Sequence, residues 1–160
     1  MGKIINNLIE LKEILEKERK KGKRIVFGNG CFDILHVGHI RYLKGAKSLG
    51  DILVIAVNDD NSVLALGKRE KVVIPAMERA EIVASIDGVD YVIVFSEPTV
   101  ENLLLTLRPD IHAKGTDYTE ESVPEKDIVT SYGGKVAIVG DPKNHSSRNI
   151  ISMIKDMREK

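Results

Sequence analysis

The strongest constraint on the fold is a regular alternation between short apolar runs and longer segments of helical pattern. Residues 25–27 and 52–57 are apolar at consecutive positions, not only at every second one. Strands with this pattern belong to parallel sheets that helices cover on both faces. The sequence therefore predicts an α/β domain with a doubly wound parallel sheet of about five strands. We expect strands at 25–27, 52–57, 89–95, 110–113 and 136–139, and helices at 37–49, 77–86, 122–132, from Pro98, and up to Met157.

An amphipathic helix precedes the first strand. Leu8, Leu11 and Leu15 recur at helical spacing within residues 1–22, with charged residues on the opposite face. The apolar stripe suits either a dimer interface or the chain's own sheet. Residues 1–24 carry eight basic and four acidic side chains. The basic stretch from Arg19 to Arg24 ends the helix, where cations suit the negative pole of its dipole, so a solvated helix end is favoured over a site for an anionic ligand. We find no repeat or linker, so the sequence predicts a single domain over residues 1–160.

Charge and cysteine content limit the function. The 24 basic residues equal the 24 acidic ones, so no overall charge favours nucleic acid or an anionic membrane. The single cysteine, Cys31, favours a reducing compartment. No apolar run approaches the roughly 20 residues of a membrane span, and the first residues lack the apolar region of a signal peptide. We therefore expect a cytoplasmic protein without nucleic-acid or membrane partners.

The turn after the first strand is the leading candidate for a ligand site. Parallel sheets bind ligands beyond the carboxyl ends of their strands. Gly28 and Gly30 allow a tight turn and close approach to a ligand. A dinucleotide fingerprint would need glycine where Asp33 stands, so this pair is weak evidence for NAD.

Two histidines follow, His36 and His39, where the loop becomes a helix. The exposed N–H groups and the positive dipole end of a helix attract anions, and Gly38 leaves room for a phosphate. Structural histidines and a zinc-binding pair are the alternatives. No further cysteine, histidine or acid stands at helical metal-site spacing. Phosphate binding is therefore the favoured interpretation.

The string NGCFDILHVGH, residues 29–39, resembles the GxFDxxHxGH motif of the HxGH nucleotidyltransferases. Within that superfamily, the chain is most similar to the adenylyltransferases that make ADP-heptose from D-glycero-β-D-manno-heptose 1-phosphate. The resemblance extends to MERAEIVASIDGVDYVIVF (77–95), RPDIHAKGTDY (108–118) and HSSRNII (145–151). It implies a Rossmann-like sheet and an enzyme that transfers AMP from ATP to a sugar 1-phosphate, releasing pyrophosphate.

The same resemblance implies roles for individual residues. His36, His39 and Lys47 would be catalytic, and Asn58 and Asp117 would bind the acceptor. Alternatively, Lys47 is an exposed charge on a helix, and Ser146 and Ser147 only cap the last helix. His145 is a further candidate for phosphate contact. The residues implied to bind the nucleotide are Gly30, Cys31, Phe32, Asp33, Gly38, Arg79, Lys114, Gly115, Ser146 and Ser147.

Some segments depart from the heptose pattern, which usually has a basic residue and lysine-glycine after the second strand. Here residues 63–67 are VLALG, followed by Lys68, Arg69 and Lys71, and the usual KGGDY is KGTDY. The first departure leaves the acceptor open. Glycerol-3-phosphate cytidylyltransferase and FMN adenylyltransferase are the enzymatic alternatives, and a catalytically silent nucleotide-binding regulator is the non-enzymatic one. We expect Mg²⁺ to be held mainly by the triphosphate, with no metal site on the protein, and a homodimer.

Overall fold

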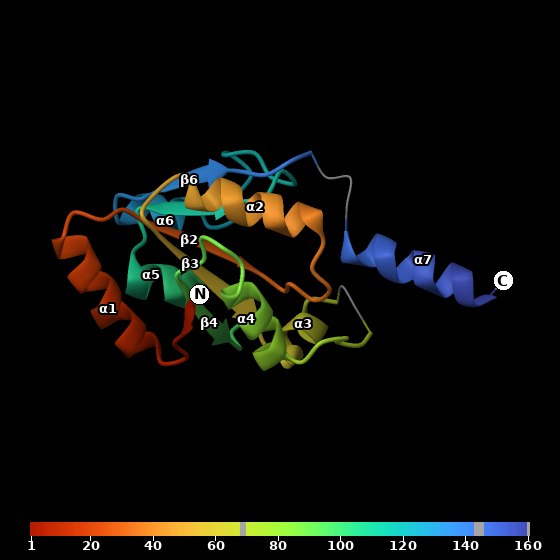
Figure 1. Cartoon of the computed structure of the whole chain (residues 1–160). Coiled ribbons are helices and arrows are strands. Elements are labelled where there is room, and N and C mark those ends of the chain that lie inside the picture. The colour runs from red at the N-terminus through yellow and green to blue at the C-terminus, as the bar shows by residue number, and fades with distance from the viewer. Residues whose placement is uncertain (68–69, 143–145, 160) are drawn as a thin grey trace.

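The structure is a computed structural model that describes residues 1–67, 70–142 and 146–159. Its strands are β1 (Lys3–Ile4), β2 (Ile25–Gly30), β3 (Ile52–Asn58), β4 (Tyr91–Phe95), β5 (Ile111–Lys114) and β6 (Lys135–Ile138). Its helices are α1 (Leu8–Lys20), α2 (Val37–Lys47), α3 (Asp60–Ala65), α4 (Ala76–Ala84), α5 (Glu101–Leu107), α6 (Lys126–Ser131) and α7 (Ser147–Glu159). The strands form one parallel sheet in the order β1-β4-β3-β2-β5-β6 (Figure 1).

The predicted doubly wound α/β fold is confirmed, with six strands instead of about five. The extra strand, β1, has two residues, which pair with Tyr91 and Val92 of β4. A strand of two residues is too short to show a hydrophobic period. Helix α3 occupies a segment expected to be a loop, and its signal is Asp59, whose side chain accepts a hydrogen bond from the Ser62 N–H.

Two layers of helices explain why the strands are apolar at consecutive positions. Helices α1, α5 and α6 cover one face of the sheet, and α2 and α4 cover the other. In β2, Ile25 and Phe27 pack in the first layer and Val26 in the second, and all three are fully buried. Each layer therefore takes alternate residues of the same strand.

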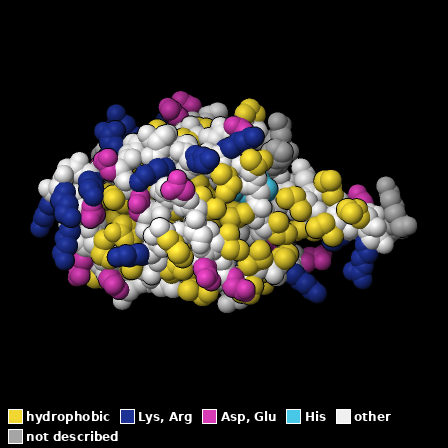
Figure 2. All heavy atoms as spheres, viewed as in Figure 1, with side chains coloured by type: hydrophobic (Ala, Val, Ile, Leu, Met, Phe, Trp, Pro, Cys, Tyr) yellow, Lys and Arg dark blue, Asp and Glu magenta, His cyan; other side chains and the backbone are white. Residues whose placement is uncertain are grey.

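Helix α1 uses its apolar stripe on its own sheet. Leu11 and Leu15 are fully buried in the first layer. Of the two expected uses of the stripe, the structure therefore shows packing on the chain's own sheet. Basic side chains gather over this end of the molecule (Figure 2). Part of that charge is neutralised locally, because Lys21 and Lys23 pair with Glu18.

Helix α7 extends away from the sheet (Figure 1). Its outer turns expose Met153, Ile154 and Met157, at 64%, 57% and 75% of their surface. These apolar side chains continue along the projecting arm in Figure 2. Among the described helices, none combines the length and the apolar character needed to cross a membrane.

Candidate active site

The main cavity opens where the order of the strands reverses. Strand β2 has β3 on one side and β5 on the other, and a cavity of about 920 Å³ lies at the carboxyl ends of these strands. This is the expected binding position in a doubly wound sheet, and the volume suits a nucleotide-sized ligand. The predicted site residues that line it are Gly30, Cys31, Phe32, Asp33, His36, Gly38, His39, Asn58, Lys114, Gly115, Asp117, Ser146 and Ser147.

The two histidines form the cap of α2. His36 is the N-cap, and its Nδ1 accepts a hydrogen bond from the Gly38 N–H at 3.1 Å. His39 Nδ1 accepts from the His36 N–H at 3.2 Å, and the two ring centroids lie 4.0 Å apart. An Nδ1 that accepts a hydrogen bond carries no proton, so a neutral ring keeps its proton on Nε2. The backbone thereby makes Nε2 the donor atom of both rings.

The loop before α2 is conformationally strained. Phe32 and Ile34 have positive φ angles of 51° and 69°, which cost on the order of 1–3 kcal/mol each for residues with a side chain. Ile34 is β-branched, so its conformation is especially unfavourable. Ser147 stabilises the loop, because its hydroxyl donates to the Ile34 carbonyl at 2.8 Å.

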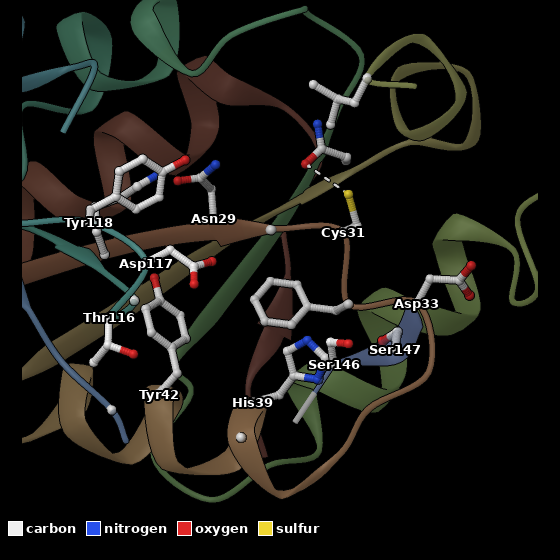
Figure 3. A pocket seen from close by; sticks show the side chains of 18 of the residues that line it. Asn29, Cys31, Asp33, His39, Tyr42, Thr116, Asp117, Tyr118, Ser146 and Ser147 are labelled. Carbon is white, nitrogen blue, oxygen red and sulfur yellow. Dashed lines mark hydrogen bonds between the residues drawn. The ribbon is translucent and has the colours of Figure 1, made fainter. Parts of the chain in front are cut away.

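Asp33 also fixes this loop. Its two carboxylate oxygens accept hydrogen bonds from the N–H groups of Val73 and Ile74, both at 2.8 Å. The side chain is almost fully buried and points away from His39 (Figure 3). Asp33 lines the cavity, and its observed contacts join the loop to the segment before α4.

Arg79, for which the sequence predicts a nucleotide contact, is not among the residues that line the cavity. Its side chain is fully buried beneath the site. The guanidinium donates to the carbonyls of Cys31, Asn58 and Ile74 and to the Asp60 carboxylate. A planar group with five donors can join several acceptors at once. Arg79 therefore ties together the ends of β2 and β3 and the start of α4.

Lys47 is also separated from the site. It is the last residue of α2, and the rise of the helix places its backbone about 16 Å from that of His36 and about 12 Å from that of His39. Its ammonium donates to the Asp90 carboxylate at 2.8 Å and to the Asp51 carbonyl. The structure thus gives Lys47 contacts between α2 and the sheet instead of a place at the cavity.

The two serines lie at the start of α7, beside His39 (Figure 3). Ser146 Oγ accepts a hydrogen bond from the Asn149 N–H at 3.0 Å, so the predicted serine cap is present. Both serines line the cavity next to the first turn of a 13-residue helix. His145, Lys68 and Arg69 lie outside the described residues.

Asn29, Tyr42, Tyr118 and Glu125 line the cavity as well, although the sequence did not single them out. Figure 3 shows Asn29, Asp117 and Tyr118 on the side away from His39 and the serines. The Tyr42 hydroxyl donates to the Ala113 carbonyl at 2.7 Å, and burial raises the pKa of Tyr42. Any side chain at Gly28 would collide with that hydroxyl, since its Cβ would lie only 2.3 Å away.

These observations place a strained, glycine-containing loop and a histidine-capped helix at the switch point of a parallel sheet. The model of the cytidylyltransferase-like family matches residues 27–157, which include the whole of this arrangement. The chain belongs to the cytidylyltransferase-like family. The expected resemblance is therefore confirmed, and the family indicates a nucleotidyltransferase enzyme.

Curated relatives of this family member include the bifunctional protein HldE of Syntrophotalea carbinolica, which is 49% identical over 149 residues. The protein of the same name from Geobacter metallireducens is 49% identical over 150 residues. These alignments cover 93% and 94% of the chain but 30% and 31% of the relatives. The chain thus spans about three-tenths of the length of the curated proteins it matches.

Solved structures give the same architecture. The lipopolysaccharide core biosynthesis protein from Thermoplasma volcanium superposes with a TM-score of 0.67 and 29% identity, over 76% of this chain and 100% of that one. Pantoate–β-alanine ligase from Francisella tularensis superposes with a TM-score of 0.68 over 100% of this chain and 79% of that one. At 19% identity the second likeness shows the fold alone.

Within the described part of this family member, we find no group of three or more histidine, cysteine, aspartate or glutamate side chains placed to hold a metal ion. Of the carboxylates that line the cavity, Asp33 faces the segment before α4 and Asp117 lies on the opposite side (Figure 3).

Proposed function

We propose that the chain transfers AMP from ATP to a sugar 1-phosphate, with D-glycero-β-D-manno-heptose 1-phosphate as the acceptor. The products are ADP-heptose and pyrophosphate. The observation that carries the chemistry is the histidine-capped helix, which presents two Nε2 donors at one end of a nucleotide-sized cavity. The acceptor rests on the residues shared with the heptose branch and on the similarity to HldE proteins.

In the proposed reaction, an oxygen of the sugar phosphate attacks the α-phosphorus of ATP in line. The new O–P bond forms as the bond between the α-phosphorus and the bridging oxygen breaks, and pyrophosphate leaves with that electron pair. His36 and His39 donate from Nε2 to the phosphate oxygens, where negative charge accumulates in the transition state. Because the backbone fixes both rings, little reorganisation accompanies this step.

The start of α7 has a complementary role in this proposal. Ser146 and Ser147 and the first-turn N–H groups of α7 hold the β- and γ-phosphates, which become the leaving group. The triphosphate brings Mg²⁺, which offsets part of its negative charge. Ser147 would also link this phosphate site to the loop before α2, since its hydroxyl donates a hydrogen bond to the Ile34 carbonyl.

One assay tests the proposal against its alternatives. Pyrophosphate release is measured with ATP or CTP in combination with heptose 1-phosphate, glycerol 3-phosphate or FMN. We expect release with ATP and heptose 1-phosphate only. Release with CTP and glycerol 3-phosphate, or with ATP and FMN, would reassign the acceptor. Nucleotide binding without release in any combination would indicate a regulator.

Asp117 provides a test of the acceptor end of the cavity. A carboxylate can accept hydrogen bonds from sugar hydroxyls, and Asp117 lies across the cavity from His39 (Figure 3). We expect Asp117→Ala to raise the KM for the sugar phosphate while the KM for ATP stays the same. The exposed neighbour Glu120, changed to alanine, is the control. A higher KM for ATP instead would assign Asp117 to the nucleotide.

The homodimer, the cytoplasmic location and the single domain over residues 1–160 stay predictions from the sequence. Because α1 covers its own sheet, the exposed apolar side chains of α7 are the better candidates for a dimer contact. Sedimentation at micromolar concentration tests this, and a monomeric mass would contradict it.

A further inference from the structure

A buried histidine near the cavity has no explanation in the proposed chemistry. His112 lies in the middle of β5, is fully buried, and packs against Phe27 with ring centroids 5.6 Å apart. Neither of its ring nitrogens has a hydrogen-bond partner among the described residues. Buried polar atoms are normally satisfied because leaving them unpaired is costly. The nearest charged group is the carboxylate of Glu125, whose Oε2 lies 3.7 Å from His112 Nε2.

Glu125 connects this histidine to the cavity. It lies just before α6, its side chain is only 13% exposed, and it lines the cavity. Its Oε1 lies 3.8 Å from Lys114 Nζ, and its Oε2 is buried without a hydrogen-bond partner in the described part of the chain. Both neighbours, His112 and Lys114, are thus farther away than the 2.7–2.9 Å of a charge-assisted hydrogen bond. The carboxylate is attracted by its neighbours, but its hydrogen-bonding capacity is not used up.

The surroundings keep Glu125 ionised. Burial alone would raise the pKa of its carboxyl group, but His112 and Lys114 together hold that pKa below the ordinary value of 4.5. Lys114 is itself fixed in place, since its ammonium lies 4.7 Å from the centre of the Tyr118 ring. Because Oε2 is enclosed beside His112, Oε1 is the carboxylate oxygen left to accept a hydrogen bond from a ligand. The wall therefore presents an ionised carboxylate and a cation held on an aromatic ring.

We propose that Glu125 is a substrate-binding residue that accepts a hydrogen bond from a hydroxyl or amino group of a bound substrate. His112 and Lys114 are its positioning residues. Two substrates carry such donors: the acceptor, through a sugar hydroxyl, and the nucleotide, through the amino group of its base. The inference rests on the proposed function only in requiring that this cavity hold the substrates of nucleotidyl transfer.

A simple structural pair is the competing interpretation. Two groups that serve only to stabilise each other would be expected at hydrogen-bond distance, because a buried ion pair must recover its cost of desolvation. The observed 3.7 and 3.8 Å separations do not meet that expectation. These distances are instead consistent with a carboxylate that accepts a hydrogen bond from a bound ligand.

The test replaces Glu125 by glutamine, which keeps the shape and removes the charge. The matched control is Glu121→Gln, the same change at an exposed position of the same segment that does not line the cavity. For Glu125→Gln we expect the KM of one substrate to rise about tenfold, because glutamine still offers an acceptor oxygen but loses the added strength of a charged acceptor. The other KM and kcat should stay close to those of the control.

The two KM measurements identify which substrate Glu125 binds. A higher KM for the sugar phosphate assigns the donor to a sugar hydroxyl, and a higher KM for ATP assigns it to the base. Unchanged KM values for both substrates, with or without a lower melting temperature, would overturn the inference. If the glutamine variant does not fold, Glu125→Asp decides in the same way, because it keeps the charge on a shorter stem.

Failure of the proposed function would look different. A wild-type protein that uses another acceptor refutes the heptose assignment, and Glu125→Gln is then measured with that acceptor. A wild-type protein that uses heptose 1-phosphate, while Glu125→Gln changes neither KM, refutes only the role of Glu125.

Discussion

Replacing His36 by asparagine should separate its role in the fold from its role in the reaction. His36 Nδ1 caps α2 by accepting the Gly38 N–H at 3.1 Å, whereas Nε2 is the atom that we propose donates to phosphate. Asparagine is a favourable N-cap, and its side-chain oxygen can accept the same N–H. It has no counterpart to Nε2. Alanine, in contrast, removes both the cap and the donor.

The expected magnitudes differ between the two variants. Losing an N-cap costs about 1 kcal/mol, which lowers the melting temperature of a chain of this size by about 2–4 °C. Losing one preorganised donor to the transition state costs roughly 10²–10³ in kcat. His36→Asn should therefore show the loss in kcat with a melting temperature within about 2 °C of wild type. His36→Ala should show the same kinetic loss together with the full thermal shift.

The measurements are steady-state pyrophosphate release and calorimetric unfolding, with ATP affinity determined separately by titration. A transition-state role requires that kcat fall far more than ATP affinity. If His36→Asn retains kcat within threefold of wild type, the assignment of Nε2 to the phosphates is wrong. If His36→Ala melts like wild type, the capping contact contributes nothing measurable.

Three other substitutions follow from the contacts described. Arg79→Met removes the donor to three main-chain carbonyls, so we expect urea unfolding to show a loss of about 3 kcal/mol or more; a loss below about 1 kcal/mol would contradict the role of Arg79 in joining these segments. Lys47→Met breaks a partly exposed ion pair with Asp90 and should cost at most about 1 kcal/mol with unchanged kcat; a tenfold lower kcat would return Lys47 to the site. The lowered pKa of Glu125 gives stability that is present above its ordinary pKa of 4.5 and is lost as the pH falls through the lowered value. Between about pH 6 and pH 3, the free energy of unfolding of Glu125→Gln, measured by urea titration, should thus fall less than that of wild type. An equal fall in both proteins would refute this.

The sheet and the position of the site were predictable because both depend on local pattern. Consecutive apolar residues such as Ile25, Val26 and Phe27 indicate burial on both faces wherever they occur. The histidine motif marks the start of a helix by its place between a strand and an apolar helical segment. Topology then brings this helix start to the switch point.

Residues that act through distant contacts were not predictable. Arg79 belongs to a motif of the family, but the sequence does not tell whether a long side chain in a helix reaches a ligand or the main chain beneath it. Lys47 follows the histidines closely in sequence, and only the length of α2 separates them in space. The pairing of Glu125 with His112 depends on how α6 meets β5, for which no local pattern exists.

The order of the strands also dictates when the cavity can form as the chain folds. Strand β2 carries the glycine turn, but its neighbour β5 comes much later in the chain, so that Val26 lies beside Ile111. Contacts of such long sequence separation form slowly, after local elements have been made. A chain emerging from the ribosome can therefore complete α2 and cap it with both histidines long before residues 114–118 supply the opposite wall. Substrate can stabilise only the finished sheet, and a fragment ending before β5 would contain the whole histidine motif yet lack the wall that residues 114–118 and the start of α7 supply.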